Sequence, residues 1–345
     1  MRPLVFRVLS ILARSPLFTR KIGVQRNFHL HIPTMLTKRC KRLVQKKGFL
    51  SIVSYLTRLV PMGKGSFLVA KTDIGRIELP IDDRSATPLI IFGYLPHEDI
   101  ETLYLYMLGL HSRTIVDIGA QYGWYCGLLA QQNPSAQVIA FEPDPQSYEY
   151  LHRNFSHLRN LIRRSEAISS RVGAATLCIA PARGLNSLVR QVGPCIAVQR
   201  TTLDTLFRSS EGKTIDLVKC DVEGGEVDVL IGARNLIRDK DAPIWMIEVV
   251  DRYLREAGRK PDDIIELLTS LSEGTFCYEI SPSGTPQRVM RFRPGVHANI
   301  FVVPSDRRFE FERAAIAVER ILNYRKRWRI GAKSENDPDR GGTSS

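Results

Sequence analysis

No C-x-x-C pair occurs in this chain, although it contains six cysteines. Paired spacing of that kind marks most structural zinc sites and thiol redox motifs, so its absence argues against both. Most of the cysteines stand inside apolar runs, where a free thiol behaves as a small hydrophobic side chain. We therefore expect reduced thiols, no disulfide framework and an intracellular protein. The six positions are Cys40, Cys126, Cys178, Cys195, Cys220 and Cys277.

An uninterrupted hydrophobic run is also missing. Residues 1–20 contain an apolar stretch, but Arg7 and Arg14 interrupt it, and a membrane-spanning helix needs roughly 20 apolar residues. The same interruptions make a poor signal-peptide core. The sequence therefore predicts no membrane-spanning segment.

Acidic residues are absent from the first 72 positions, which hold fifteen Lys or Arg and carry a charge of +15. Residues 73–345 carry 34 Lys or Arg against 36 Asp or Glu, a net charge of −2. A nearly neutral body argues against nucleic-acid binding, because that function requires a basic surface.

Three interpretations remain for the basic extension, residues 1–64. Its first 20 residues place Leu4, Val8, Ile11 and Leu12 on one helical arc, which is typical of a helix at a membrane surface. Under this interpretation the protein is cytoplasmic and makes a peripheral contact with an anionic membrane. An acid-free, Arg-rich segment also suits an organellar transit peptide. The third interpretation is a disordered extension, with Met35 as a later start. The oligomeric state is left open.

Strand-like and helix-like segments alternate from about residue 111. The apolar runs TIVDI, QVIAFE, TIDLVKCD and APIWMIEV have strand length, and segments with helical periodicity separate them. This alternation implies right-handed crossovers and a parallel sheet with helices on both faces. TFCYEI and NIFVVP follow one another without a helix, which predicts an antiparallel pair at one edge.

We divide the chain into five parts on this basis. They are the basic extension (1–64), lead-in strands and a helix (65–110), a Rossmann-like domain (111–305), a C-terminal helix (306–330) and a disordered tail (331–345).

Acidic residues follow five predicted strands at their carboxyl ends, where ligands of open α/β sheets collect. A single acid there is often only a helix N-cap, but five in register favour a ligand site. They are Asp117, Glu142, Glu166, Asp221 and Glu248.

The turn after the first parallel strand, DIGAQYGWY, has two of the three glycines of the dinucleotide fingerprint, Gly119 and Gly123. Asp117 precedes them, and a fixed carboxylate works against a phosphate at this place. It suits a cationic ligand instead. S-adenosylmethionine has no phosphate and carries an ammonium and a sulfonium, and Glu142 suits its ribose hydroxyls. The turn therefore favours S-adenosylmethionine over NAD as the cofactor.

Four segments, in order and at similar spacing, resemble the motifs of the FkbM-type S-adenosylmethionine-dependent methyltransferases. They are VDIGAQYGWY, VIAFEPDPQSYEYLHRNF, RTTLDTL and IDLVKCDVEGGEVDVLIGA. The resemblance covers residues 94–303, and Gln121 departs from it where the family often has asparagine or histidine. It implies a class I methyltransferase fold, a mostly parallel seven-stranded sheet with an antiparallel edge strand. It also implies methyl transfer to a hydroxyl, on a sugar, a glycan or glycolipid, or a secondary metabolite.

The resemblance implies roles for the residues around the first strand. Asp117 would face the methionine part of the cofactor. Gly119, Ala120 and Gly123 would let the backbone approach it, with Gln121 in the same turn.

The nucleoside part would lie further along the sheet. Glu142 would bind the ribose hydroxyls, and Pro143 would lie near the adenine. Glu166 with Ala167 would border the adenine edge.

Proton transfer from a hydroxyl acceptor requires a base near the methyl group. Asp221 and Glu223 follow the fourth strand beside that place, and Glu248 is a third candidate. His297 is weaker, because a lone histidine before an edge strand is usually structural. No ligand spacing in the sequence is diagnostic of a metal, so we expect none.

Other functions stay open at this point. A base N-methyltransferase would show an Asn/Asp-Pro-Pro-aromatic run where this chain has Asp221-Val222-Glu223-Gly224. An NAD-dependent oxidoreductase conflicts with Asp117. A non-catalytic nucleotide-binding or membrane-associated scaffold leaves the five strand-end acids unexplained.

Overall fold

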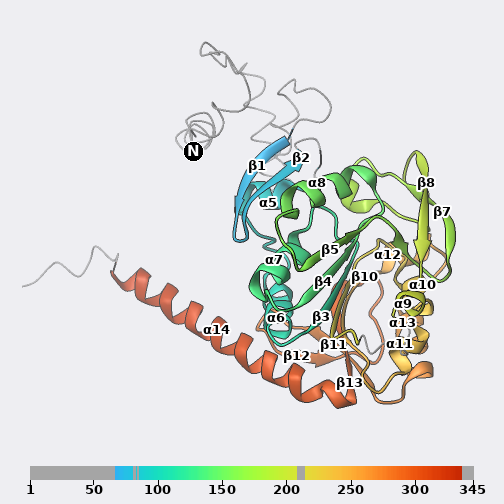
Figure 1. Cartoon of the computed structure of the whole chain (residues 1–345). Helices are drawn as coiled ribbons and strands as arrows, with labels where there is room; N and C mark the ends of the chain where they lie inside the picture. The colour runs from blue at the N-terminus through green and yellow to red at the C-terminus, as the bar shows by residue number, and fades with distance from the viewer. Residues whose placement is uncertain (1–66, 81–82, 84, 208–213, 336–345) are drawn as a thin grey trace, which may run out of the picture.

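The computed structural model describes residues 67–335 except 81–82, 84 and 208–213 (Figure 1). The predicted basic extension, with its membrane interpretation, lies outside the described residues.

A hairpin and two helices precede the main sheet. β1 (Phe67–Thr72) pairs antiparallel with β2 (Gly75–Pro80), and α5 (Thr87–Phe92) and α6 (Asp99–Gly109) follow. The two strands and the helix α6 lie where the sequence pattern predicts them.

Eight strands form the main sheet, in the spatial order β12-β11-β13-β10-β9-β3-β4-β5. Their bounds are β3 Thr114–Ile118, β4 Gln137–Phe141, β5 Leu161–Arg164, β9 Leu217–Cys220, β10 Ile244–Val250, β11 Thr275–Ile280, β12 Pro286–Arg288 and β13 His297–Pro304. The five strands from β5 to β10 are parallel neighbours. Strand order reverses between β3 and β9, the kind of switch point where such sheets bind ligands.

The class of fold predicted from the sequence is confirmed, with two differences in detail. β13 pairs antiparallel with β11, as predicted, but it lies between β10 and β11. A short eighth strand, β12, pairs antiparallel with β11 and forms the edge.

A small second sheet has the order β6-β8-β7. It contains β6 (Ala167–Ile168), β7 (Gly173–Cys178) and β8 (Cys195–Thr201). The antiparallel register places Cys178 opposite Cys195, and the two form a disulfide. The expectation of six reduced thiols is therefore wrong, and the cysteine argument for an intracellular protein loses its basis. Cys126, Cys220 and Cys277 are free and buried.

Helices cover both faces of the main sheet. Successive residues of β3 point to opposite sides, so Ile115 belongs to one apolar cluster and Val116 to the other. The first cluster packs against α6, α7 (Trp124–Gln132), α8 (Pro145–Phe155) and α14 (Arg308–Glu335). The second packs against α10 (Glu226–Ile231), α11 (Arg234–Arg238) and α13 (Asp262–Leu271). Short helices occur at α9 (Leu203–Leu206) and α12 (Asp251–Glu256), with 3-10 turns at Arg183–Leu185 and Ser305–Arg307.

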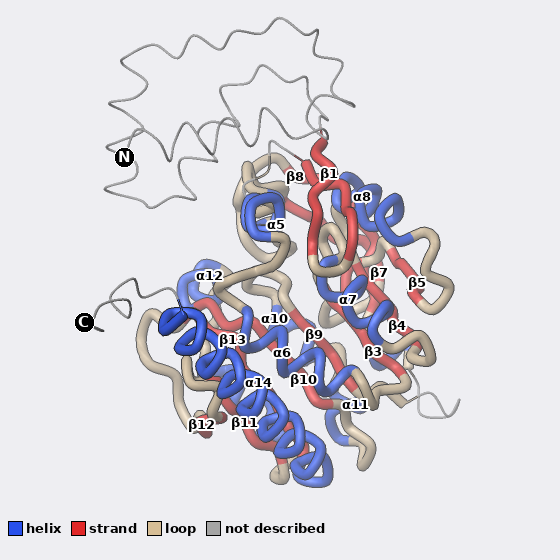
Figure 2. Tube along the Cα trace, turned by 90° about the vertical axis from the view of Figure 1, so that its left-hand side faces the viewer, coloured by secondary structure: helices blue, strands red, loops and turns tan. Residues whose placement is uncertain are grey.

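The C-terminal helix α14 packs against the body through its first half. Phe311, Ala314 and Val318 are buried in the first apolar cluster, and Figure 2 views the side where α14 lies over α6. Figure 1 shows its second half projecting from the body. It continues to Glu335, into the segment predicted as a tail. Among the described helices, none combines the length and the apolar character needed to cross a bilayer.

Candidate functional site

A pocket lies at the carboxyl ends of β3, β4 and β9, beside the switch point of the sheet. It contains about 620 Å³ of space including its open mouth, within the range of small-molecule sites. Its wall is formed by Ile118, Gly119, Gln121, Phe141, Glu142, Pro143, Ala167, Ile168, Leu177, Arg183, Gly184, Asn186, Leu188, Asp221, Val222 and Glu223.

The turn after β3 passes very close to the backbone that follows β9. Gly119 has a φ of +80°, and a Cβ on it would lie 1.9 Å from the carbonyl oxygen of Asp221. Only glycine satisfies both conditions. This glycine therefore allows the two strand-end loops to meet at the pocket wall.

Glu142 joins the β3 turn to the end of β4. Its two carboxylate oxygens accept hydrogen bonds from the backbone N–H groups of Gln121 and Asp144, each at 2.8 Å. Burial raises the pKa of Glu142 to about 8. Each oxygen keeps a second lone pair, so a buried carboxylate in the wall suits a pair of ribose hydroxyls.

The wall fits an adenosine-type cofactor as the sequence predicts. Glu142 supplies hydroxyl acceptors, and Phe141, Pro143, Ala167 and Ile168 supply an apolar surface for a flat base. Of the predicted cofactor residues, those in the wall are Gly119, Gln121, Glu142, Pro143, Ala167 and Asp221.

Asp117 lies behind this wall, with 1% of its surface exposed. One carboxylate oxygen accepts from the Cys126 N–H at 3.0 Å, and the other lies 3.7 Å from Lys219 Nζ. Lys219 also contacts Asp221 Oδ2 at 3.2 Å. The cation that the sequence led us to expect beside Asp117 is thus supplied by the protein. A role for Asp117 in contacting the cofactor stays a prediction.

Three other predicted cofactor residues lie outside the wall. Ala120 is buried in the first apolar cluster. Gly123 precedes α7 with a φ of +91°, and a Cβ there would meet the Phe155 ring at 2.6 Å. The Glu166 carboxylate forms a close ion pair with Arg164. In the structure these residues shape the loops around the pocket.

The three predicted catalytic carboxylates do come together. One oxygen each from Asp221, Glu223 and Glu248 lies within 4.8 Å of the others. Burial, followed by repulsion from Asp221, raises the pKa of Glu223 to about 10 and that of Glu248 to about 8. Glu223 also has a φ of +58°, a conformation that costs a non-glycine residue energy and is frequent at functional sites.

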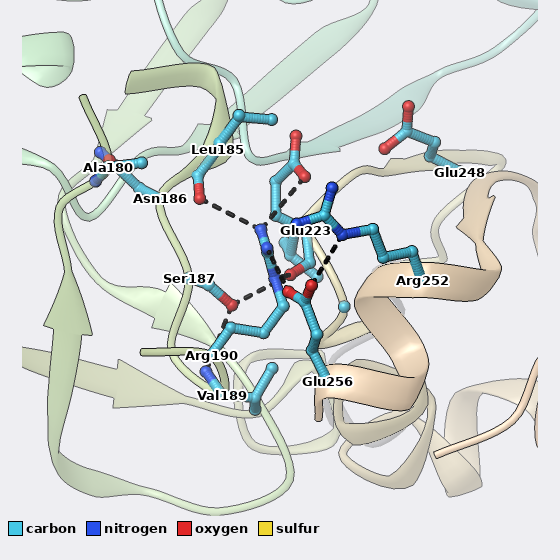
Figure 3. Close-up of polar contacts among 12 residues, drawn as sticks. Ala180, Leu185, Asn186, Ser187, Val189, Arg190, Glu223, Glu248, Arg252 and Glu256 are labelled. Carbon is cyan, nitrogen blue, oxygen red and sulfur yellow. Dashed lines mark hydrogen bonds and ion pairs between the residues drawn. The ribbon is translucent and has the colours of Figure 1, made fainter. Parts of the chain in front are cut away.

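Arg190 holds this strained residue from the loop between β7 and β8, as Figure 3 shows. Its Nε donates to the Glu223 carbonyl oxygen at 2.7 Å, and Nη2 lies 3.4 Å from the Glu223 carboxylate. Nη1 pairs with Glu256 of α12 at 3.1 Å, and the guanidinium lies 4.0 Å from the centre of the Tyr253 ring. Ser187 Oγ donates to the same Glu223 carbonyl at 3.0 Å. Only 4% of the Arg190 side chain is exposed. Its contacts connect the β7–β8 loop with the turn after β9 and with α12.

Residues outside the quoted motifs complete the pocket. Arg183 lines it, and its Nη1 pairs with Asp144 at 3.0 Å while its N–H donates to Asp83 at 3.2 Å. Gln121 Nε2 donates to Ser85 Oγ at 2.7 Å. The loop between β7 and β8 thus contributes Arg183, Gly184, Asn186 and Leu188 to the pocket wall.

Sequence reasoning missed Lys219, Arg183 and Arg190. Lys219 gave a signal, because a lysine inside a buried parallel strand needs a partner. The arginines gave none, because Arg190 contacts Glu223, 33 positions away, and Arg183 contacts Asp144, 39 positions away.

The protein supplies its own cations to the acidic cluster. Asp221 contacts Lys219, Glu223 contacts Arg190, and Glu248 contacts His297. Each of the three carboxylates therefore has a partner side chain within the protein.

Comparison with known proteins gives the following matches. Residues 117–276 match the family model of the methyltransferase FkbM domain. The chain is 29% identical over 177 residues to the 2-O-methyltransferase NoeI of Sinorhizobium fredii, covering 45% of this chain and 71% of NoeI. It is 26% identical over 160 residues to the hexuronic acid methyltransferase AglP of Haloferax volcanii, covering 46% of this chain and 62% of AglP.

Solved structures with a similar arrangement are more distant. M. jannaschii TYW2, solved in complex with AdoMet, aligns over 70% of this chain and 86% of its own, with a TM-score of 0.37 and 15% identity. An S-adenosylmethionine-dependent O-methyltransferase of Thermotoga maritima aligns over 72% and 80%, with a TM-score of 0.34 and 14% identity.

Proposed function

Because this chain is an S-adenosylmethionine-dependent methyltransferase with an FkbM domain over residues 117–276, we propose that it methylates a hydroxyl group on a saccharide-containing acceptor. The observation that carries the proposal is the meeting of Asp221, Glu223 and Glu248 at the edge of the cofactor pocket. Carboxyl groups in such a cluster accept and donate hydrogen bonds to neighbouring hydroxyls, which sugars present in series. AglP, by its name, acts on a hexuronic acid, and NoeI methylates a 2-oxygen.

When bound, S-adenosylmethionine supplies an electrophilic methyl group on a cationic sulfur. Glu142 would hold its ribose, and the apolar wall around Pro143 and Ala167 its base. Asp221 and Glu223, which close the other end of the wall, would lie beside the sulfonium and orient the acceptor oxygen for an in-line approach. Holding the two reactants in this geometry supplies much of the rate acceleration.

A labelled-methyl transfer screen tests this proposal. The full chain is offered methyl glycosides, uronic acids and hydroxylated small metabolites, with an RNA and a DNA sample as controls. We expect label on a saccharide oxygen and none on nucleic acid. Asp221→Asn should lower kcat by about 10²-fold, the scale of a misplaced reactant, because Asp221 would orient the acceptor. Transfer to RNA or DNA alone would contradict the proposal.

Location is part of the same proposal. We place the enzyme in the cytoplasm with a peripheral contact to anionic membrane, supported by the +15 charge of the first 72 residues. Acceptors at a membrane surface, such as glycolipids, would suit this placement.

A further inference from the structure

A histidine–glutamate pair stands one strand beyond the cofactor pocket. The register pairs Ile247 of β10 with Cys220 of β9, so Glu248 and Asp221 leave their strands side by side. Because β13 runs antiparallel to β10, its first residue, His297, lies opposite Val250 at the same edge. The sheet topology therefore brings His297 to the end of the sheet where the cofactor pocket opens.

The geometry of the pair suits a base and its orienting partner. His297 Nε2 lies 3.2 Å from Glu248 Oε1, with 68% of the histidine side chain exposed but 14% of the glutamate. The buried carboxylate thus fixes one ring nitrogen, which leaves Nδ1 on the exposed side of the ring with a free lone pair. Glu248 would also stabilise the charge that the ring gains on protonation.

The other acidic groups at the site are less suited to accept a proton. Lys219 Nζ lies 3.2 Å from Asp221 Oδ2, so this carboxylate is already engaged in an ion pair with a buried lysine. Glu223 is engaged by Arg190 through both its carbonyl and its carboxylate. Its pKa, raised to about 10 by burial and by Asp221, keeps it protonated at neutral pH.

We propose that His297 accepts the proton of the acceptor hydroxyl and that Glu248 positions and stabilises its imidazole. This inference rests on the proposed O-methylation. The bond from the acceptor oxygen to the methyl carbon forms as the sulfur–methyl bond breaks, and the bonding pair stays on the sulfur. The hydroxyl proton passes to His297 Nδ1 and from there to solvent.

The chain contains a matched control pair. His97 Nε2 lies 3.2 Å from Glu98 Oε1, with 62% of the histidine side chain exposed. The charged groups that act on His297 are Glu248 of β10, Glu98 before α6, and Asp221 after β9; His97 interacts with it as well. Glu98 is further held by Tyr125. Glu248 and His297 act on His97 in turn, but the hydrogen-bond partner of His97 is Glu98 and not a residue of the acidic cluster.

The experiment compares His297→Asn with His97→Asn in the full chain. Single-turnover methyl transfer uses the saccharide that accepts label in the screen, and calorimetry measures S-adenosylhomocysteine affinity. We expect His297→Asn to lower the rate at least 100-fold with affinity within threefold of wild type. His97→Asn should stay within fivefold of the wild-type rate. Equal losses in both variants, or a wild-type rate in His297→Asn, would overturn the inference.

The pH profile separates a base from a merely structural histidine. The hydrogen bond to Glu248 raises the pKa of His297 above its ordinary value, and a base works only while neutral. The methyl-transfer rate should therefore fall as the pH drops below that raised pKa. In Glu248→Gln the fall should occur at a lower pH. Glu98→Gln removes a charge that acts on His297 without a hydrogen bond to it, so it should lower the pKa of His297 less than Glu248→Gln does. A pH–rate profile that Glu248→Gln leaves unchanged would contradict the pairing of His297 with Glu248.

Histidine NMR makes the test independent of the acceptor. His297, assigned through the His297→Asn spectrum, should titrate above pH 6.5 in wild type and at lower pH in Glu248→Gln. If no saccharide accepts label, the proposed function fails. The titration then decides the pairing: an unchanged His297 pKa in Glu248→Gln overturns the inference, and a lowered one supports the His297–Glu248 unit.

Discussion

Asp117 illustrates how a single residue is interpreted differently in sequence and in structure. A carboxylate before a glycine turn indicates a cation nearby, and that inference holds. The cation in the structure is Lys219, from the middle of β9, which contacts both Asp117 and Asp221. Such a buried network is costly to break, because removing one charge leaves the other without a partner. We therefore predict a structural role for Asp117 and a cofactor-binding role for Glu142.

Two isosteric variants test this separation. Glu142→Gln should weaken S-adenosylhomocysteine binding by about 1–3 kcal/mol, the cost of a buried polar group without a partner, because the amide NH2 cannot accept the hydrogen bond that a carboxyl oxygen accepts. Asp117→Asn should lower the free energy of unfolding by about 3 kcal/mol, with a much smaller effect on affinity. Calorimetry and urea denaturation on both proteins measure the two quantities. Lost affinity at unchanged stability in Asp117→Asn would mean that Asp117 does contact the cofactor.

At the scale of elements, the β7–β8 hairpin contributes most to the site without any motif of its own. Its loop lines the cofactor pocket through Arg183, Asn186 and Leu188. The same loop holds Glu223 through Ser187 and Arg190. The Cys178–Cys195 disulfide closes the base of this loop.

The double variant Cys178→Ser/Cys195→Ser should therefore be less stable and bind the cofactor more weakly. A closed loop of this length, with a sequence separation of 17, corresponds to about 3 kcal/mol in the chain-entropy account. Denaturation and S-adenosylhomocysteine calorimetry are compared with and without a dithiol reductant. The reductant should lower both values in wild type and change neither in the serine variant. If the reductant changes neither the stability nor the affinity of the wild type, the arginine contacts hold the loop without the disulfide.

Elements buried on both faces were predictable, and exposed ones were not. β3, β4, β9 and β10 are continuous apolar runs, which the sequence displays directly. β12 has three residues, none of them buried, and β8 is exposed along most of its length. Neither has a periodicity to detect. The disulfide depends on the register between β7 and β8, which no local pattern specifies.

The same contrast applies to the site. The position of Gly119, Glu142 and Asp221 in the pocket wall was predictable, because they follow strands at the carboxyl edge of the sheet, where such sheets form their pockets. Arg190 was not, because its role depends on three segments meeting in space. The contact between His297 and Glu248 was not predictable for the same reason, because the two residues lie 49 positions apart.

At the scale of the whole molecule, buried carboxyl groups surround the site at the carboxyl edge of the sheet. Burial is the largest cause that raises the pKa of each of them. The values are about 8 for Glu142, about 10 for Glu223 and about 7 for Glu226. The folded protein thus retains protons at a pH where the unfolded chain has released them.

This retention makes stability depend on pH in a specific direction. In the unfolded chain these groups lose their protons near pH 4.5, the ordinary value for glutamate. Between that pH and about 7 to 8 the folded state binds more protons, so the free energy of unfolding falls as pH rises. Each retained proton contributes about 1.4 kcal/mol per pH unit. Urea denaturation of the full chain should therefore show lower stability at pH 8 than at pH 6. Glu226→Gln, away from the pocket wall, should flatten the slope. Stability that rises from pH 6 to pH 8 would mean that these carboxylates are ionised in the folded protein, with Lys219, Arg190 and His297 balancing their charge.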